Sequence, residues 1–221
     1  MTRNDFSISR KPSNHQRRTA MSKVFSSHAV SVDGYISGRK PDGEHTFGRG
    51  LGEASMLFNW YNDGDTPSKV FDGFRLSAPS AQFFDLIADR VGAAVAGRTT
   101  YEHSGHWGGD SPHPTAPLIL VSHRSAPKLS SKQTLITTGI EDAIAAAKKV
   151  AGDKDVALMG GGLLTSALEA DLVDEVILHQ VPILLGGGHS FFQELPKHVR
   201  LRLLEVIAAP GVTHLHYEVI R

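Results

Sequence analysis

The chain has 221 residues, of which 40% are hydrophobic, and it carries 23 basic and 23 acidic side chains. This length and composition suffice for a core of its own, and the balanced charge argues against nucleic-acid or anionic-membrane partners, which select a basic surface. Cysteine is absent, which excludes disulfides and thiolate chemistry, and no apolar run approaches the roughly 20 residues of a membrane-spanning helix, so we expect a cytoplasmic protein with no membrane partner.

The N-terminal segment differs in composition from the rest of the chain. Residues 1–20 contain five Lys or Arg against one Asp, with almost no apolar periodicity, which predicts a disordered basic tail. From Met21 onward the sequence has the composition of a folded domain. Because no internal repeat or second domain boundary is visible, we expect residues 21–221 to form one domain.

The domain begins with a predicted strand over residues 23–32, which ends at the strong turn signal Asp33-Gly34. Residues 38–52 hold five glycines and predict a long loop, of the kind that is usually functional or disordered. A short helical segment is expected over residues 53–61.

The remaining elements alternate between apolar strands and helices. A helix is predicted over residues 77–91, where a Ser cap and a proline precede apolar residues at helical spacing. Another is predicted over residues 140–153, where acids come first and lysines last. The further predicted elements are strands over 92–98, 116–124, 134–139, 155–159, 173–183, 200–209 and 212–220, and a helix from about 163 to 171. Such alternation favours a largely parallel sheet covered on both faces, and the last two strands favour an antiparallel edge hairpin.

Three consecutive glycines, Gly160, Gly161 and Gly162, stand between the strand over 155–159 and the next helix. Glycine weakens the interior of a helix or strand by roughly 0.5–1 kcal/mol relative to alanine, so three in a row indicate a special conformation or a close approach. A helix N-terminus at the carboxyl end of a parallel strand presents unpaired N–H groups, against which a phosphate could sit. A tight turn without a ligand is the alternative, and the glycines alone do not decide between the two.

Two further strand ends carry hydroxyl or guanidinium groups suited to an anion. They are Gly97, Arg98, Thr99 and Thr100 after one strand, and Ser122 and Arg124 after another. No lysine follows the glycines as in a phosphate-binding loop, and no G-x-G-x-x-G motif follows the first strand. Phosphoryl transfer and an ordinary Rossmann domain are therefore disfavoured.

The sequence resembles the RibD C-terminal domain family, the reductase domain found at the C-terminal end of bacterial riboflavin-biosynthesis deaminase-reductases. The matching segments are SVDGYISG, AGRTTYE, LVSHR, MGGGLLTSAL, LVDEVILHQVPILLGGG and THLHY, between about residues 24 and 217. The resemblance implies a three-layer dihydrofolate reductase-like α/β fold, with a mostly parallel central sheet and an antiparallel C-terminal edge hairpin. It also implies a homodimeric, NADPH-dependent reductase that transfers a hydride to a C=N or C=O bond of a pyrimidine- or pterin-like heterocycle.

The resemblance assigns cofactor-binding roles to several residues. Gly160, Gly161 and Gly162, with Leu163 and Leu164, would lie against the cofactor pyrophosphate. Gly97, Arg98, Thr99 and Thr100 would form a second phosphate-facing helix start, and Ser122 and Arg124 would read the 2′-phosphate. Dihydrofolate reductases have a cis peptide in the glycine motif, and the corresponding bond here is Gly160–Gly161.

The candidate catalytic residues are Asp33 and Glu102. Asp33, with Gly34 and Tyr35 as substrate contacts, matches the loop beside the nicotinamide, where the carboxylate would orient substrate or relay a proton. An ordinary Asp-Gly turn is the alternative. Glu102 would face the cleft or lie solvated on a helix surface.

Aromatic residues follow the glycine-rich loop. Trp60 is a candidate substrate contact that would form an apolar lid with Phe58 and Tyr61, unless these aromatics belong to the core. A second glycine run, residues 186–188, either turns the chain or lines the cofactor cleft.

Two departures from related enzymes limit the assignment. A chain without cysteine cannot carry the zinc deaminase activity of the bifunctional riboflavin enzymes. The acid that dihydrofolate reductases place after the first loop has several candidates here, namely Glu53, Asp63, Asp65 and Asp72. Activity like that of 5-amino-6-(5-phosphoribosylamino)uracil reductase or like that of dihydrofolate reductase therefore remains open.

Functions other than that of a reductase also stay open for this sequence. A non-catalytic nucleotide- or pterin-binding protein and a structural dimer with an empty cleft are the alternatives to a reductase. We expect no metal site, because His103, His106 and His113 around Asp110 lack the one-turn spacing of a helical zinc pair.

Overall fold

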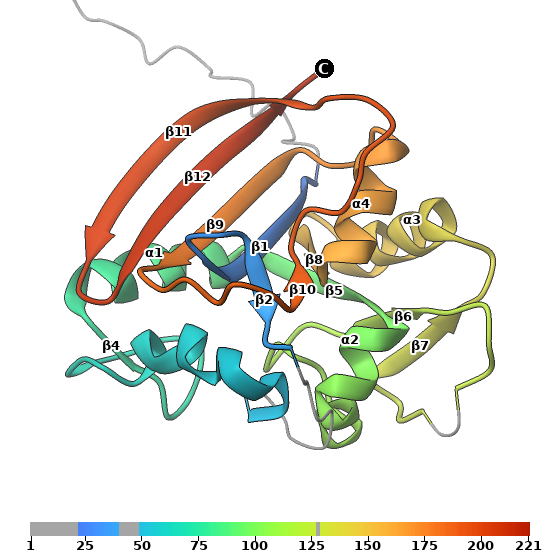
Figure 1. The fold of residues 1–221 in the computed structure, drawn as a ribbon. Helices are drawn as coiled ribbons and strands as arrows, with labels where there is room; N and C mark the ends of the chain where they lie inside the picture. Colours follow the sequence, from blue (N-terminus) through green and yellow to red (C-terminus); the bar gives the residue numbers. More distant parts are fainter. Residues whose placement is uncertain (1–21, 40–48, 127–128) are drawn as a thin grey trace, which may run out of the picture.

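The computed structural model describes residues 22–39, 49–126 and 129–221, and the tail expected over residues 1–20 lies outside them. The described residues form a three-layer α/β domain (Figure 1). The strands are β1 (Val24–Ser31), β2 (Tyr35–Ser37), β3 (Thr66–Pro67), β4 (Arg75–Leu76), β5 (Val91–Gly97), β6 (Leu118–Val121), β7 (Gln133–Ile136), β8 (Asp155–Met159), β9 (Glu175–Val181), β10 (His189–Ser190), β11 (Arg200–Ala209) and β12 (Val212–Ile220). The helices are α1 (Ala78–Asp89), α2 (Arg98–His103), α3 (Ile140–Ala151) and α4 (Gly161–Glu169), with two 3₁₀ segments, η1 (Arg49–Tyr61) and η2 (Gly105–Gly109).

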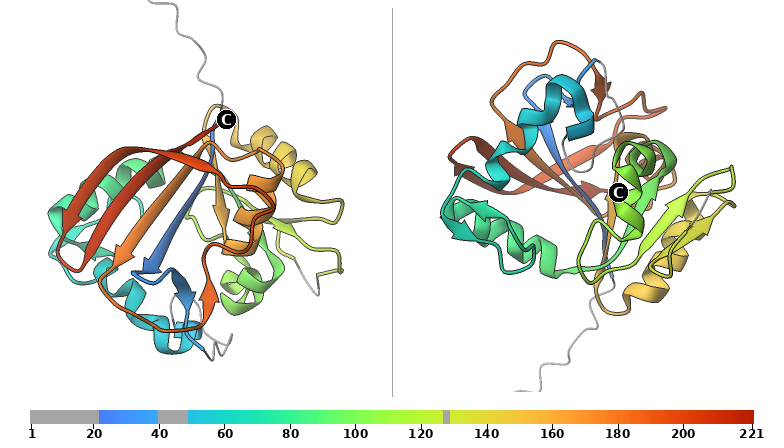
Figure 2. Two further views of the ribbon diagram at one scale, coloured as in Figure 1. Left: turned by 45° about the horizontal axis from the view of Figure 1, so that its top comes forward. Right: turned by 90° about the horizontal axis from the view of Figure 1, so that it is seen from below.

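The central sheet has, within the described residues, eight strands in the order β11-β12-β9-β1-β8-β5-β6-β7. The strands from β9 to β7 run parallel, and β12 and β11 add an antiparallel hairpin beyond β9. Figure 1 and the left view of Figure 2 show this hairpin at the edge of the sheet, away from α3 and α4. The predicted α/β class, the mostly parallel sheet and the antiparallel edge hairpin are therefore confirmed.

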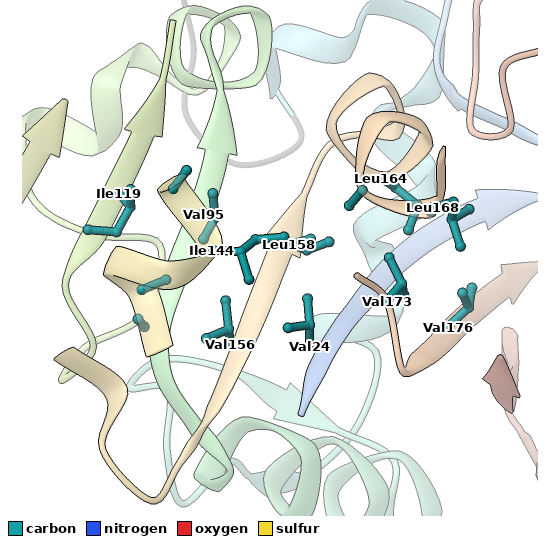
Figure 3. Packing of buried hydrophobic residues seen from close by; sticks show 14 of the residues in the cluster. Val24, Val95, Ile119, Ile144, Val156, Leu158, Leu164, Leu168, Val173 and Val176 are labelled. Carbon is teal, nitrogen blue, oxygen red and sulfur yellow. The ribbon is translucent and has the colours of Figure 1, made fainter. Parts of the chain in front are cut away.

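Helices cover the sheet on both faces. Buried side chains of α3 and α4 pack on one face, where Ile144, Leu164 and Leu168 point toward strand residues such as Val95 and Leu158 (Figure 3). The other face is covered by α1, η1 and α2 through three further apolar clusters. Buried residues recur along α1 at helical spacing, and this amphipathic pattern is what made the helix predictable.

The chain topology brings three strand ends together. β8 lies between β1 and β5, so the carboxyl ends of these three parallel strands are neighbours at one edge of the sheet. In Figure 1 that edge faces downward, toward η1 and α2. Parallel sheets bind ligands at such an edge, where successive connections leave in different directions.

Several local expectations differ from the structure. The segment expected over 53–61 is a 3₁₀ helix that begins at Arg49, and the helix expected from about 163 begins at Gly161. The short pair formed by β2 and β10 was not predicted, because the two strands are far apart in the sequence. No helix in the described parts of the chain is long and apolar enough to cross a membrane.

The second glycine run contacts β2 and Arg39 rather than the cavity described below. A Cβ on Gly188 would lie 1.9 Å from the carbonyl oxygen of Ser37, and Arg39 Nη2 donates a hydrogen bond to the carbonyl oxygen of Gly186 at 3.0 Å. These glycines allow the chain to pass close to β2. Of the two readings left open by the sequence, the structure favours a turn of the chain, because Gly186 and Gly188 have positive φ and none of the three glycines lines the cavity.

Candidate functional site

A cavity of about 530 Å³ opens at the carboxyl ends of β1, β8 and β5. Its walls come from β1, the first turns of α2 and α4, the η1 segment and the short strand β10. This volume lies within the range of about 300–1,000 Å³ that is typical of small-molecule sites. The location agrees with the strand ends that the sequence singled out.

The triple glycine forms the turn from β8 into α4. Gly160 has φ +101° and ψ 140°, and its N–H donates to Nε2 of His28 at 2.7 Å. α4 then begins at Gly161, and residues 161–163 line the cavity. First-turn amides have no acceptor within their own helix, so these N–H groups are suited to an anion.

The cis peptide expected at Gly160–Gly161 is absent, because no peptide bond between described residues is cis. The chain instead changes direction through the positive φ of Gly160, a conformation that glycine adopts without steric cost.

Neighbouring protein atoms leave no room for side chains at the first two glycines. A Cβ on Gly160 would lie 2.3 Å from Oγ1 of Thr100, and one on Gly161 would lie 2.4 Å from the carbonyl oxygen of Phe191. A Cβ on Gly162 would meet only the side chain of Gln193, at 3.4 Å. The glycine run predicted that other atoms come close to the backbone here. Part of that close approach is made by protein atoms, from Thr100 in α2 and from Phe191 after β10.

The predicted residues Gly97, Arg98, Thr99 and Thr100 all line the cavity. The guanidinium of Arg98 donates to Oε1 of Glu102 at 2.7 Å and to the carbonyl oxygen of Ser125 at 2.8 Å. Arg98 thereby connects the start of α2 to the loop after β6. Glu102 is not among the cavity-lining residues, and the hydrogen bond from Arg98 lowers the pKa of its carboxyl.

Ser122 and Arg124 lie beside Arg98 but do not line the cavity. Ser122 is buried, and its Oγ accepts hydrogen bonds from the backbone N–H of Arg124 at 3.1 Å and from Arg98 Nη1 at 3.4 Å. The Arg124 side chain is exposed. Their predicted role at a 2′-phosphate stays a prediction.

Asp33 lies in the turn between β1 and β2, outside the set of cavity-lining residues. Its carboxylate accepts hydrogen bonds from Ser31 Oγ at 2.6 Å and from the amides of Gly186 and Leu185 at 2.7 and 3.1 Å. These bonds lower the pKa of the Asp33 carboxyl, and the bond from Ser31 has the largest effect. In this arrangement the carboxylate connects the turn to the second glycine run, and its predicted catalytic role is not tested.

The remaining predicted residues divide between core and cavity. Gly34, Tyr35, Trp60 and Leu164 do not line the cavity, and both Trp60 and Leu164 are buried in the core. By contrast, Phe58 and Tyr61 of η1 do line it, with their rings stacked at 5.9 Å and nearly parallel. Of the three aromatics considered for a lid, the two that flank Trp60 therefore reach the cavity.

Sequence reasoning missed other cavity residues, namely Ser27, His28, His103, His189 and Gln193. The signal available for the first two was the polar run Ser26-Ser27-His28 inside an otherwise apolar strand. Burial lowers the pKa of His28 to about 4, so the ring is neutral at pH 7. Because Nε2 accepts from Gly160, the ring proton is on Nδ1, which faces Ser26 Oγ at 3.0 Å.

No described Asp or Glu side chain lines the cavity. The candidates for the acid of dihydrofolate reductases include Asp63, Asp65 and Asp72, all of which are exposed outside it. No three His, Asp or Glu side chains come together as metal ligands in the described parts of the chain. His113, for example, is buried and hydrogen-bonded to the carbonyl oxygen of Ala88 at 3.1 Å.

The family follows from comparison with known proteins. The family model of the RibD C-terminal domain matches residues 22–215. The chain belongs to the RibD C-terminal domain family. The uncharacterised protein YwjB of Bacillus subtilis (strain 168) is 26% identical over 127 residues, which are 58% of this chain and 73% of YwjB. The resemblance read from the sequence motifs is thus confirmed.

Solved structures confirm the dihydrofolate reductase-like fold. A Shewanella sp. PV-4 protein provisionally assigned to riboflavin biosynthesis superposes with a TM-score of 0.67 at 24% identity, covering 90% of this chain and 99% of that chain. Dihydrofolate reductase from Enterococcus faecalis, solved with NADP(H) and RAB-propyl, superposes with a TM-score of 0.55 at 13% identity, covering 90% of this chain and 97% of that chain. At these identities the likeness shows the fold alone.

Proposed function

We propose that this member of the RibD C-terminal domain family is an NADPH-dependent reductase that transfers a hydride to a C=N or C=O bond of a pyrimidine- or pterin-like small molecule. The observation that carries the proposal is the cavity that joins the amide-rich start of α4 to the stacked rings of Phe58 and Tyr61. One end suits phosphate groups and the other suits flat heterocycles.

The groups present on the cavity wall fit a dinucleotide cofactor. The first-turn amides of residues 161–163 suit the pyrophosphate, and the hydroxyls of Thr99 and Thr100 supply further donors. The close packing at Gly160 and Gly161 holds that helix start in place. NADPH, when bound, supplies the hydride. The residues of the chain orient the rings and exclude water.

The preference for NADPH over NADH is proposed to reside in Arg98, Ser122 and Arg124. The hydrogen bonds of Arg98 connect the cavity wall to the end of β6, where the exposed Arg124 side chain adds a second guanidinium. Guanidinium and hydroxyl groups suit a phosphate dianion, whereas NAD-specific sites favour an acid at the ribose.

A titration with NADPH and NADH, followed by nicotinamide fluorescence and thermal shift, tests the cofactor assignment. We expect tight NADPH binding and weak NADH binding. Arg124→Ala should weaken NADPH roughly ten- to a hundredfold, since a hydrogen bond to a charged group contributes about 1.5–3 kcal/mol, and should leave NADH unchanged. Arg202→Ala on β11, remote from the cavity lining, is the matched control. Failure of both cofactors to bind would overturn the proposal.

A non-catalytic nucleotide- or pterin-binding protein is the second candidate. It is favoured by one observation, the lack of a carboxylate among the described cavity residues. Oxidation of NADPH in the presence of 5-amino-6-(5-phosphoribosylamino)uracil or dihydrofolate, followed at the nicotinamide absorbance, separates the two. Cofactor binding without any turnover of a heterocycle would favour the binding protein.

The homodimer implied by the family resemblance is proposed to use the edge strand β11. Its outward side chains include Leu201, Leu203, Leu204 and Val206, each between 37% and 51% exposed. Figure 2 shows that the strand forms the free edge of the sheet. A contiguous exposed apolar surface of this kind is typical of a protein interface.

A further inference from the structure

A chain of five hydrogen-bonding side chains runs from the cavity through the core to the start of α1. Ser27 Oγ in the cavity wall lies 2.8 Å from Nε2 of His179 on β9, and Nδ1 of His179 lies 2.7 Å from Nδ1 of His214 on β12. Nε2 of His214 lies 2.9 Å from Oγ of Ser80 in α1, which accepts a hydrogen bond from Ser77 Oγ at 3.0 Å. The proposed cofactor site uses none of these five residues.

The two imidazoles are enclosed by aromatic rings. Both histidines are 1% exposed, and the Trp60 ring lies 4.9 Å from that of His179 and 5.1 Å from that of His214. Phe83 stacks on His214 at 5.2 Å, and Phe84 approaches His179 edge-on at 6.2 Å. Burial lowers the pKa of His214 to about 4 and that of His179 well below its usual value. Both rings are therefore neutral at pH 7, with one N–H each.

The direction of the hydrogen bond between Ser77 and Ser80 decides which nitrogen of each ring carries the proton. Ser80 accepts from Ser77, so its own hydroxyl proton has one described acceptor, Nε2 of His214. The proton of His214 is then on Nδ1 and points at Nδ1 of His179, whose own proton must be on Nε2. Nε2 of His179 donates to Ser27 Oγ. In the reverse order Ser80 would donate to Ser77 and Ser27 would donate to His179, so the positions of the ring protons distinguish the two orders.

We propose that the Ser27 hydroxyl is a hydrogen-bond donor into the cavity, directed at the substrate nitrogen or oxygen that gains negative charge during hydride addition, and that His179 and His214 are positioning residues that keep it a donor. This inference rests on the proposed reductase function. A donor held in place before the reaction stabilises the developing charge without reorganisation. The substrate class it selects is a heterocycle with an acceptor heteroatom on the reduced double bond.

The surroundings of Ser27 support this role. Ser27 and Ala29 line the cavity on the sheet face that η1 covers, the same side as Phe58 and Tyr61. The adjacent His28 has no proton to give to the cavity, because both ring nitrogens are engaged with Gly160 and Ser26. No described carboxylate is available there either. A neutral hydroxyl supported by neutral imidazoles thus stabilises the developing charge, and the proton that completes the reduced bond comes from water.

The positions of the ring protons test the inference without any turnover. In ¹⁵N–¹H correlation spectra of the labelled full-length protein at pH 7, we expect a protonated Nε2 in His179 and a protonated Nδ1 in His214. The signals are assigned with His179→Gln and His214→Gln. Protonated Nδ1 in His179 with protonated Nε2 in His214 would make Ser27 the donor to His179 and would overturn the inference. Ser80→Ala should reduce the population with protonated His179 Nε2.

Kinetics provide the second readout. Ser27→Ala should lower kcat for NADPH oxidation with 5-amino-6-(5-phosphoribosylamino)uracil or dihydrofolate by about 10²–10³-fold, the usual effect of losing one oxyanion donor, with an unchanged Kd for NADPH. Ser27→Thr, which keeps the hydroxyl, should restore kcat. Ser80→Ala should give a smaller fall in kcat. Ser68→Ala is its matched control. Ser68 Oγ also donates a hydrogen bond to a residue of α1, Asp85, but it does not contact the histidines.

The two proposals fail in different ways. A wild-type kcat in Ser27→Ala would overturn the role of Ser27 while leaving the reductase function intact. Lack of turnover by the wild-type protein would count against the reductase function, whereas reversed ring protons would count against the present inference alone. Thermal melting of each variant excludes loss of fold as the cause.

Discussion

The first turn of α4 allows one substitution to be compared at three neighbouring positions. In Gly161→Ala the new Cβ would lie 2.4 Å from the carbonyl oxygen of Phe191, and an ordinary contact of 3.4 Å requires the backbone to move by about 1 Å. In Gly162→Ala the nearest atom is already 3.4 Å away, in the flexible side chain of Gln193. Gly160→Ala combines a 2.3 Å approach with a φ of +101°.

These distances predict the order in which the three alanine variants lose stability. Overpacking of a well-packed site costs about 1–3 kcal/mol, so Gly161→Ala should lose about that free energy of unfolding. The backbone of Gly160, with φ +101° and ψ 140°, is nearly confined to glycine and costs about 1–3 kcal/mol more at an alanine, which makes Gly160→Ala the least stable variant. Gly162→Ala should be neutral or gain up to about 0.5–1 kcal/mol, since alanine is the better helix former. Gly161→Ala and Gly162→Ala should therefore differ by about 1–4 kcal/mol.

Urea unfolding at one protein concentration measures the difference. With a slope of about 1–3 kcal/mol per molar urea, the midpoint of Gly161→Ala should lie below that of Gly162→Ala by at least about 0.3 M. NADPH binding should weaken in Gly161→Ala, in which the start of α4 is displaced, and persist in Gly97→Ala. Gly97 also lines the cavity, but its new Cβ would meet only Leu163 at 3.9 Å. Equal midpoints for Gly161→Ala and Gly162→Ala would refute the reasoning.

Three further predictions concern pH, the β1–β2 turn and the sheet edge. The free energy of unfolding should fall from pH 6.5 toward pH 4, because the buried His28 and His214 have native pKa values of about 4 while the unfolded chain binds protons near 6.5. Each contributes up to about 1.4 kcal/mol per pH unit, and equal urea midpoints at pH 7 and pH 5 would contradict this. Asp33→Asn should lower the melting temperature, since the carboxylate accepts a bond from the Gly186 amide; unchanged melting with lost turnover would instead support its catalytic role. Leu203→Lys, at a 51% exposed position, should convert a dimer to a monomer in light scattering, and a monomeric wild type would refute the interface.

The regular elements were predictable because their signals are local. The strand over 155–159 has the observed bounds, and the helix over 140–153 ends within two residues of α3. Apolar runs and a terminal charge pattern encode both. The role of Glu102 was equally local, since Arg98 and Glu102 stand at i and i+4 on one helix, the spacing of a helix ion pair.

The deeper part of the site depends on contacts that no local pattern encodes. His28 meets Gly160 across 132 positions of the chain, and Ser27 meets His179 across 152. Each of these residues has an ordinary local explanation, since a polar residue in a strand can face water on an open side of the sheet. Only the strand order, with β1 between β8 and β9, brings the partners together. Strand order is a long-range property that the periodicity of single elements does not determine.

The two glycine runs resemble one another in sequence but differ in what they accommodate. The run at 186–188 lets the chain pass the carbonyl oxygen of Ser37, beside the strand β2. The run at 160–162 instead lets Thr100 and Phe191 approach the start of α4 from two sides. Because those contacts constrain the first turn, its free amides face the cavity in a fixed direction before any ligand arrives. In the proposed cofactor site the glycines would therefore act indirectly, by allowing protein atoms to hold the helix start where a phosphate can reach it.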